Sequence, residues 1–284
     1  MLFAPSLTRG WFLYDNFGVN PSNTPGTSVI PGASDAEGAW TAVASAANIA
    51  QDVYGFFIRV SDGSSTAQSK PHLLDVGVDP AGGTAYSAII SNVVCGGSPA
   101  TGVGIGLVFF FPFYIKAGSS VAVRIQGNHA TAGTVRVGIR FYGQQSQPEV
   151  LPVGSFSETI GTITNSDGVT YTPGNAADGA WVSLGTTVKA LWWWQIGMQR
   201  SNSAGANETL YTEISHGDAT NKNIITRVMT RGDNAGNLTH ILPLQHSFFE
   251  AYCPVPAGAE IWIRGRCENA PDTGYNGVAV GIGG

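Results

Sequence analysis

The sequence predicts an all-β protein built from two β-sandwich, jelly-roll-like domains in tandem. Three observations predict this fold class. The first two are that the chain repeats itself at a spacing of about 140 residues and that apolar residues within each copy alternate with polar or small ones. The third is the composition of the 284 residues, with 38 Gly, 15 Pro and 12% charged side chains, against roughly 25% in an average protein. Such a composition suits many short strands joined by turns.

The repeat consists of motifs that follow one another in the same order in both halves. Arg59 and Arg200 each end an apolar stretch nineteen residues after a tryptophan, and Asp75 and Glu213 occupy equivalent positions further on. Ordered matches at a nearly constant spacing indicate that one domain was duplicated. The matching segments are 38–40 with 179–181, 115–124 with 255–264, and 134–142 with 276–282.

Short strands separated by turns are indicated throughout each copy. Apolar residues occupy every second position in 121–125 and 135–139, which is the period of a strand with one buried face. The Ala-rich stretch 39–53 has the composition of a short helix, but its match in the second copy holds β-branched and aromatic residues, which favours strand. Clusters of turn-forming residues interrupt these runs at 61–65, 79–83, 96–99 and 128–133.

The repeat also sets the domain boundaries. We expect an N-terminal arm over 1–19, a first sandwich over 20–143, a polar linker over 144–149 and a second sandwich over 150–284. The arm contains Trp11-Phe-Leu-Tyr14, which is too apolar to remain in water. It is therefore expected to dock on its own body or on a neighbouring subunit.

Charge and hydropathy limit the classes of partner. The net charge of −5 and the pI near 5.4 leave no basic surface to neutralise phosphate, which argues against nucleic acid. The longest apolar run, 105–115, is shorter than the roughly 20 residues that a membrane helix needs, so no membrane span is predicted. No basic residue precedes the short apolar stretch at the N-terminus, so no secretion signal is inferred.

The three cysteines, Cys95, Cys253 and Cys267, leave at least one without an intramolecular partner, which argues against a disulfide scaffold. If Pro256-Ala-Gly258 is a turn between two antiparallel strands, Cys253 and Cys267 lie roughly 20 Å apart at about 3.3 Å per residue. Buried thiols of a protein made in a reducing cytoplasm are the favoured interpretation.

No motif of catalysis or cofactor binding stands out. The five histidines lack the spacing of zinc hydrolases, and His240 and His246 are separated by Pro243, which interrupts a strand. The glycine run 102–106 is followed by no lysine and no helix pattern, and no Gly-x-Ser-x-Gly elbow occurs. The sequence therefore predicts no enzyme, no cofactor and no metal.

Two polar patterns have structural explanations. Asp75 and Glu213 belong to different copies, so they form no catalytic pair, and pairing of each with an arginine at the sandwich edge is favoured. Arg231-Gly-Asp233 spells an integrin-type tripeptide, but it is also ordinary turn chemistry. We expect both patterns to serve the fold.

Aromatic and apolar residues are the candidates for contact surfaces. In Trp192-Trp-Trp194, strand alternation either buries Trp193 and exposes the other two or does the reverse. Exposed aromatic pairs on a sheet anchor protein interfaces and also stack on sugar rings; subunit packing is the favoured explanation. The predicted interface residues are Leu2, Phe3, Trp11, Phe12, Tyr14 and Phe17 of the arm, together with Trp192 and Trp194.

Several of these motifs together resemble the β-sandwich modules of virion proteins of tailed bacteriophages. They are the strand ending in Arg59, the segment Leu73-Leu-Asp-Val-Gly77, the turn Pro256-Ala-Gly258 before Ile261-Trp-Ile-Arg264, and the glycine-punctuated last strand. The resemblance covers residues from about 20 to the end, and the first copy departs from it at Ile115-Lys-Ala-Gly118, where the leading proline is absent. It implies a head decoration (cement) protein or a tail or fibre component, and it carries over no catalytic residue.

We therefore expect a virion structural protein, folded in a host cytoplasm, that forms a homo-oligomer and binds major capsid or tail proteins. The alternative is a host-recognition module of a tail fibre or spike that binds surface glycan through its loops or through Trp192 and Trp194. A β-sandwich glycosidase is a third hypothesis, and the missing carboxylate pair argues against it.

Overall fold

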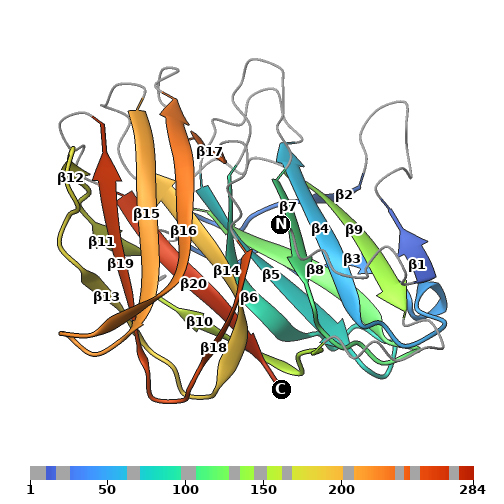
Figure 1. The fold of residues 1–284 in the computed structure, drawn as a ribbon. Helices are drawn as coiled ribbons and strands as arrows, with labels where there is room; N and C mark the ends of the chain where they lie inside the picture. Colours follow the sequence, from blue (N-terminus) through green and yellow to red (C-terminus); the bar gives the residue numbers. More distant parts are fainter. Residues whose placement is uncertain are drawn as a thin grey trace.

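In the computed structural model the chain forms two β-sandwiches side by side, which confirms the predicted fold class (Figure 1). Helical structure in the described part of the chain is confined to one 3-10 turn, Ala46–Asn48. The structure describes residues 11–16, 26–62, 71–96, 107–127, 135–143, 152–161, 168–200, 208–233, 240–243, 250–268 and 275–284.

The first sandwich packs two sheets face to face, which we call sheet 1A and sheet 1B. Sheet 1A has the strand order β1-β9-β4-β7, with β2 also paired to β9, and sheet 1B has the order β3-β8-β5-β6. The strands are β1 (Trp11–Asp15), β2 (Thr27–Val29), β3 (Thr41–Ala44), β4 (Gly55–Asp62), β5 (Pro71–Asp79), β6 (Ser87–Gly96), β7 (Leu107–Phe111), β8 (Ser120–Gly127) and β9 (Val135–Gly143).

The second sandwich repeats this plan with sheets 2A and 2B. Sheet 2A has the order β10-β20-β14-β18, with β11 also on β20, and sheet 2B has the order β12-β19-β15-β16-β17, with β13 also on β19. The strands are β10 (Phe156–Ile160), β11 (Val169–Tyr171), β12 (Gly174–Asn175), β13 (Val182–Thr186), β14 (Leu191–Arg200), β15 (Glu208–Gly217), β16 (Lys222–Asp233), β17 (His240–Pro243), β18 (Glu250–Val255), β19 (Glu260–Cys267) and β20 (Tyr275–Gly283).

With β12 and β17 set aside, the two strand orders are identical. The strands β1 and β10 are equivalent in the two copies. Trp11 of β1 pairs with Gly143 of β9, just as Phe156 of β10 pairs with Gly283 of β20. Residues 11–15 of the expected arm therefore form the edge strand of the first sandwich.

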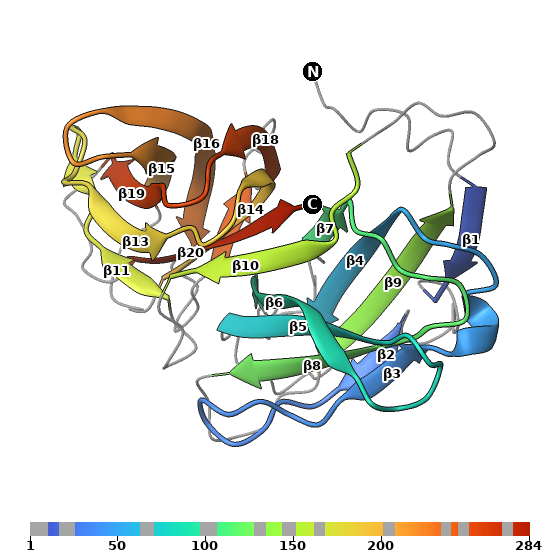
Figure 2. The ribbon, with the colours of Figure 1, turned by 90° about the horizontal axis from the view of Figure 1, so that it is seen from below.

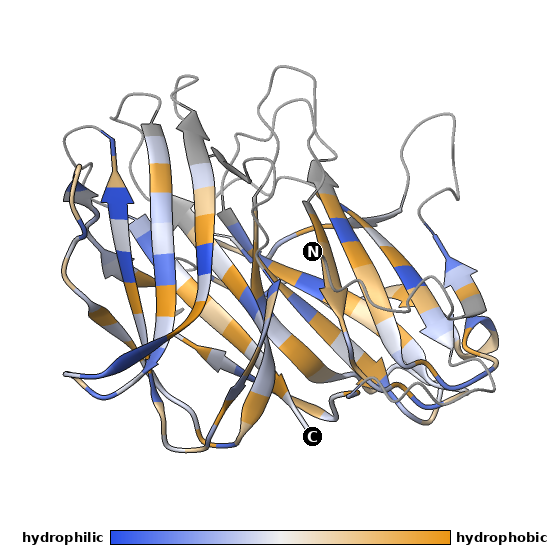
Figure 3. Cartoon of the chain, viewed as in Figure 1, coloured by the Kyte–Doolittle hydropathy of each residue, from blue (hydrophilic) through white to orange (hydrophobic). Residues whose placement is uncertain are grey.

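Each sandwich encloses its own apolar core. Strand residues alternate between core and surface, as in β19, and Figure 3 shows bands of apolar and polar residues along β15. Fully burying one large apolar side chain contributes about 1.5–3 kcal/mol. The largest fully buried side chains include Phe56, Phe111 and Phe141 in the first core and Tyr171, Trp194 and Tyr275 in the second.

The central strand β20 of sheet 2A is buried on both faces. Every residue of β20 is buried, because its inner face meets sheet 2B and its outer face meets the first sandwich. Val280 and Ile282 on that outer face belong to the core of the first sandwich, and β10, β14 and β20 all contact β6 (Figure 2). The two sandwiches therefore share one apolar interior along this seam.

Strand pairing corrects the predicted equivalence of Arg59 and Arg200. Phe56 pairs with Phe111 and Phe141, and Trp194 makes the corresponding pairs with β18 and β20. Phe56 is thus the counterpart of Trp194, and Arg59 corresponds to Gly197. The sequence match failed because both copies place an arginine near the end of an apolar strand, at different registers.

The turn 256–258 does not join two strands of one sheet. It leads from β18 in sheet 2A to β19 in sheet 2B, so the antiparallel pairing assumed for Cys253 was wrong. Cys95 and Cys267 are buried thiols and Cys253 is a half-buried one. The Ala-rich stretch 39–53 forms one short strand, β3, followed by the 3-10 turn.

Candidate functional site and interaction surfaces

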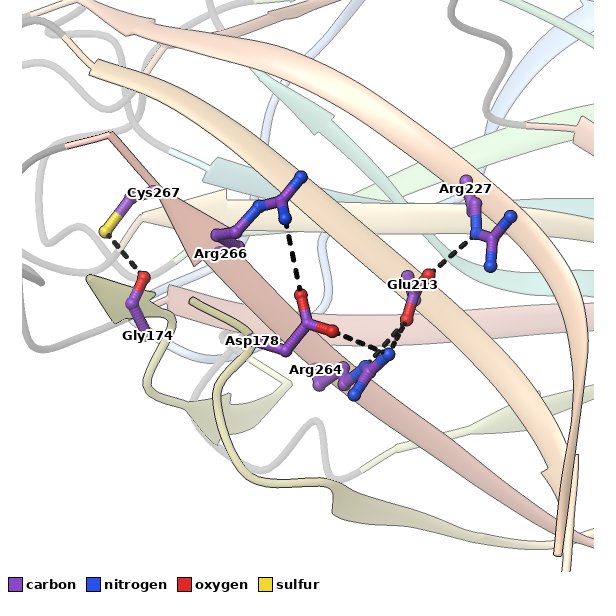
Figure 4. Close-up of polar contacts among 7 residues, drawn as sticks. All are labelled: Gly174, Asp178, Glu213, Arg227, Arg264, Arg266 and Cys267. Atoms are coloured by element: carbon purple, nitrogen blue, oxygen red, sulfur yellow. Dashed lines mark hydrogen bonds and ion pairs between the residues drawn. The ribbon is translucent and has the colours of Figure 1, made fainter. Parts of the chain in front are cut away.

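A cluster of charged side chains occupies the outer face of sheet 2B (Figure 4). Glu213 on β15 pairs directly with Arg264 on β19 and with Arg227 on β16. Arg264 Nε and Nη2 lie 2.6 and 2.5 Å from Glu213 Oε2, and Arg227 Nε lies 2.7 Å from Oε1. Arg264 also reaches Asp178 at 2.9 Å and lies 4.4 Å from the ring centre of Trp181.

Glu213 is charged in this setting despite its burial. Desolvation would raise the pKa of its carboxyl group, but the hydrogen bonds from Arg227 and Arg264 outweigh it and hold the pKa below its ordinary value. Both carboxylate oxygens accept from a guanidinium, so neither can serve as a general base.

The first sandwich carries the same cluster at the same place. Arg124 on β8 donates to Asp75 on β5 at 2.9 Å, contacts Glu37, and lies 4.5 Å from the ring centre of Trp40. The second oxygen of Asp75 accepts from the backbone N–H of Asn92 at 2.8 Å, where β6 bulges and Asn92 takes a φ of 62°. The shorter aspartate thus reaches a bulged backbone where Glu213 reaches Arg227.

The clusters explain the duplicated acids. An arginine pairs with each, as predicted, but the partners are Arg124 and Arg264, whose strands lie directly alongside those of Asp75 and Glu213. A guanidinium covers a face of both tryptophan rings, which removes that face as a platform for a sugar. We assign both clusters to the stability of the outer sheets.

The seam between the sandwiches is closed by side chains. Ser157 and Thr159 on β10 donate their hydroxyls to the carbonyl oxygens of Ile89 and Ser91 on the edge of β6, each at 2.7 Å. The free backbone polar groups of an edge strand are thereby satisfied without a further strand.

The edge of β7 is satisfied by Glu250 of β18, whose Oε1 accepts the Phe110 N–H at 2.9 Å. Burial raises the pKa of this carboxyl group, and the Phe110 hydrogen bond only partly opposes the shift. Phe110 also meets Trp193 edge to face, with ring centres 5.9 Å apart. The edges of β6 and β7 are thus used within the chain.

Trp194 is not a surface residue. It is 0% exposed in the second core, and its indole N–H donates to the Cys253 carbonyl at 2.9 Å, so its predicted interface role is wrong. Trp192 and Trp193 are both half-buried against the first core, because the pairing of β14 with β18 shifts between Leu191 and Trp193. This bulge breaks the alternation from which the prediction was made.

The predicted arm residues fall into three groups. Tyr14 docks on its own body: its hydroxyl donates to the Val43 carbonyl at 3.3 Å and its ring stacks on Phe141. Trp11 and Phe12 are placed by their backbone in β1, opposite Gly143 and Tyr142. Leu2, Phe3 and Phe17 lie outside the described residues.

Exposed apolar side chains mark surfaces that the sequence-based interpretation missed. Tyr252 on β18 is 58% exposed and lies 5.8 Å from Trp192 between ring centres. Met229 and Ile224 on β16 are 42% and 37% exposed, and Val108 on β7 is also exposed. The apolar outward positions of β16 were the available signal, because in 222–233 they break the alternation of a strand with one wet face.

The other motifs considered in the sequence lie as follows. Arg231-Gly-Asp233 is not a turn, because it lies within β16 and its residues pair with both β15 and β17. His240 begins β17, which ends at Pro243, whereas His246 and the glycine run 102–106 lie outside the described residues. Among the described residues no group of three His, Cys, Asp or Glu side chains is arranged to hold a metal, and no helix has the length and apolar character to span a bilayer.

Comparison with known proteins shows likeness in structure alone. No family model and no curated protein sequence matches the chain. The tandem CBM22-1-CBM22-2 domain of Paenibacillus barcinonensis Xyn10C is similar over 96% of this chain and 98% of that one, at 11% identity and a TM-score of 0.31. PNGF-II is similar over 90% of this chain and 65% of its own, at 7% identity and a TM-score of 0.41. The STIV MCP, a viral major capsid protein, matches over 90% and 93%, at 8% identity and a TM-score of 0.36. Likenesses of this size carry no argument about activity or ligand.

Proposed function

We propose that the chain is a structural protein of a bacteriophage virion, a capsid decoration or cement protein that acts through contacts with its own copies and with major capsid or tail proteins. The observation that carries the proposal is the set of exposed apolar side chains on strands β7, β16 and β18. Large exposed apolar residues on sheet edges are typical of surfaces that other proteins cover.

The internal pairing of charges supports the same reading. The acids of both clusters are neutralised by arginines within the chain, and charged residues make up only 12% of the sequence. A surface with little charge repels its neighbours weakly, which suits dense packing on a particle assembled in a host cytoplasm.

Binding to particles tests the proposal. Particles produced without this chain are mixed with the purified protein and sedimented, and saturable binding at a fixed number of copies per particle is expected. The proposal is wrong if the chain stays in solution and is also missing, by mass spectrometry, from gradient-purified native particles.

A second candidate is recognition of surface glycan, and the pair Trp192 and Tyr252 favours it. Their rings lie 5.8 Å apart and Tyr252 is the more exposed of the two, so a sugar ring has one aromatic surface to stack on. Trp194 cannot contribute, because it is buried. A glycan array probed with the native chain and with the variant Tyr252→Ala tests this site. Equal signals from both proteins, or no signal from either, exclude it.

A further inference from the structure

The contact between the two sandwiches joins different surfaces of one repeated unit. The first sandwich contributes its side, where the edges of β6 and β7 meet, and the second contributes the outer face of sheet 2A. Such a contact is heterologous, that is, head to tail. The side of the second sandwich corresponds to the side of the first, and the outer face of sheet 1A corresponds to that of sheet 2A. This contact does not join these two corresponding surfaces to each other.

The side of the second sandwich lies between β16 and β18, the counterparts of β6 and β7. Val93 pairs with Leu74 and Val228 pairs with the equivalent Thr212, and both valines point into their cores. Met229 is therefore the counterpart of Val94. Val94 is buried against the second sandwich, where a side chain on Gly197 would collide with it. Met229, at the same position, is 42% exposed.

Ile224 is a second exposed apolar residue on β16. Gly77 pairs with Ala88 as the equivalent Ser215 pairs with Ile224, so Ile224 is the counterpart of Ala88. Ala88 lies next to Ile89, whose carbonyl accepts from Ser157 in the seam, and Ile224 is 37% exposed. The strand β17 pairs only with Thr230–Asp233, so it does not run alongside 224–229.

The outer face of sheet 1A is the matching receptor. Strand pairing makes Phe57, Arg140 and Tyr142 the counterparts of Gln195, Val280 and Ile282, which form the seam in sheet 2A. Phe57 lies 4.9 Å from Phe110 and 5.8 Å from Tyr142 between ring centres, and all three rings sit on this face. Phe110 also meets Trp193 of the second sandwich, whereas Phe57 and Tyr142 are half-buried.

We propose that copies of this chain associate head to tail, with the β16 and β18 side of one copy seated on the outer face of sheet 1A of the next. The inference rests on the proposed assembly role and names its partner, a second copy. The contact joins separate molecules, so it forms as the concentration of the chain rises. A heterologous contact closes into a ring or extends into a filament.

Sedimentation of the full chain over a concentration series tests the proposal. The native protein is expected to grow beyond a monomer, and the double variant Ile224→Lys with Met229→Lys is expected to weaken association about tenfold or more. Phe57→Glu, with Tyr142→Glu as a second version should the first misfold, is expected to do the same from the other surface. Val188→Lys, which changes a side chain 79% exposed elsewhere on the chain, is the control and should associate like the native protein.

Mixing the two kinds of variant gives the decisive result. Each retains one intact surface, so the mixture should form dimers of one copy of each variant and stop there. A native protein that is monomeric at every concentration, a mixture that stays monomeric, or association lost equally in the Val188→Lys control overturns the proposal. Particle binding is measured on the same variants, so a monomer that still binds particles refutes the head-to-tail contact and leaves the decoration role standing.

Discussion

Removing the charge of Glu213 should destabilise the second sandwich by about 2–4 kcal/mol. In Glu213→Gln the guanidinium of Arg264, whose side chain is 24% exposed, loses two charge-assisted hydrogen bonds but keeps Asp178. Leaving one partner of a buried ion pair alone costs about 3–5 kcal/mol, and the remaining exposure and the Asp178 contact reduce that figure. Arg227 is 56% exposed, so water screens its pairing and its contribution is smaller.

Urea denaturation followed by tryptophan fluorescence measures the effect, with double-mutant cycles separating the two arginines. The coupling of Glu213 to Arg264 should be about 1.5–3 kcal/mol and that to Arg227 should be several times smaller. Glu260→Gln is the control, since its carboxylate accepts from the Ser183 hydroxyl and pairs with no arginine among the described residues. Equal couplings, or a loss below about 0.5 kcal/mol in Glu213→Gln, would refute the assignment.

The effect of Glu213 should also depend on pH. Because its pKa is lowered in the folded chain, its stabilising contribution is present above the unfolded-state pKa and is lost as pH falls through the folded-state value. The difference between the native chain and Glu213→Gln should therefore shrink in acid. A difference that stays constant across that range would contradict the ion-pair explanation.

Three further predictions follow from burial. Trp194→Ala should lower the free energy of unfolding by about 3–5 kcal/mol, as expected for a large side chain removed from a core, whereas a loss below about 1 kcal/mol would place the residue elsewhere. Of the thiols, Cys253 should react first with a soluble disulfide reagent, because Cys95 is fully buried and burial raises its pKa to about 12; labelling of Cys95 before unfolding would show that the core opens. Glu250→Gln keeps an acceptor for the Phe110 N–H. The raised pKa of Glu250 means that folding disfavours its charged form, so the variant should be at least as stable as the native chain at neutral pH. The variant should also lack the native gain in stability as pH falls toward the unfolded-state pKa of Glu250, and equal pH profiles of the two proteins would contradict this.

The fold could be predicted because its signals are local. Alternation over a few residues and motif spacing over about 140 positions both lie in the sequence, and they indicated the strands and the duplication. The pairing of Asp75 with Arg124 and of Glu213 with Arg264 could not be assigned, because it depends on which strands lie side by side. Spacing along the chain does not contain that information.

The surfaces were harder to predict for two physical reasons. Trp194 lies in the core, and just before it the pairing of β14 with β18 shifts because β18 has one residue more between the pairs at Leu191 and Trp193; such a shift leaves no mark in a run of three tryptophans. The apolar residues Val278, Val280 and Ile282 read as a strand with one buried face, yet they lie on the outer face of sheet 2A and the first sandwich covers them. Only tertiary packing distinguishes a sheet face that meets water from one that meets another domain.

The seam has a mechanical consequence. Among the described residues no strand ladder joins sheet 2A to the first sandwich. The link consists of apolar packing, two backbone hydrogen bonds of Gly154 with Pro112 and Tyr114, and side-chain hydrogen bonds of Ser157, Thr159 and Glu250 with edge-strand backbone. Under tension a few such bonds rupture sooner than a ladder sheared along its whole length. Pulled from its two ends, the molecule should part into two intact halves before either unravels, and it can rejoin without refolding.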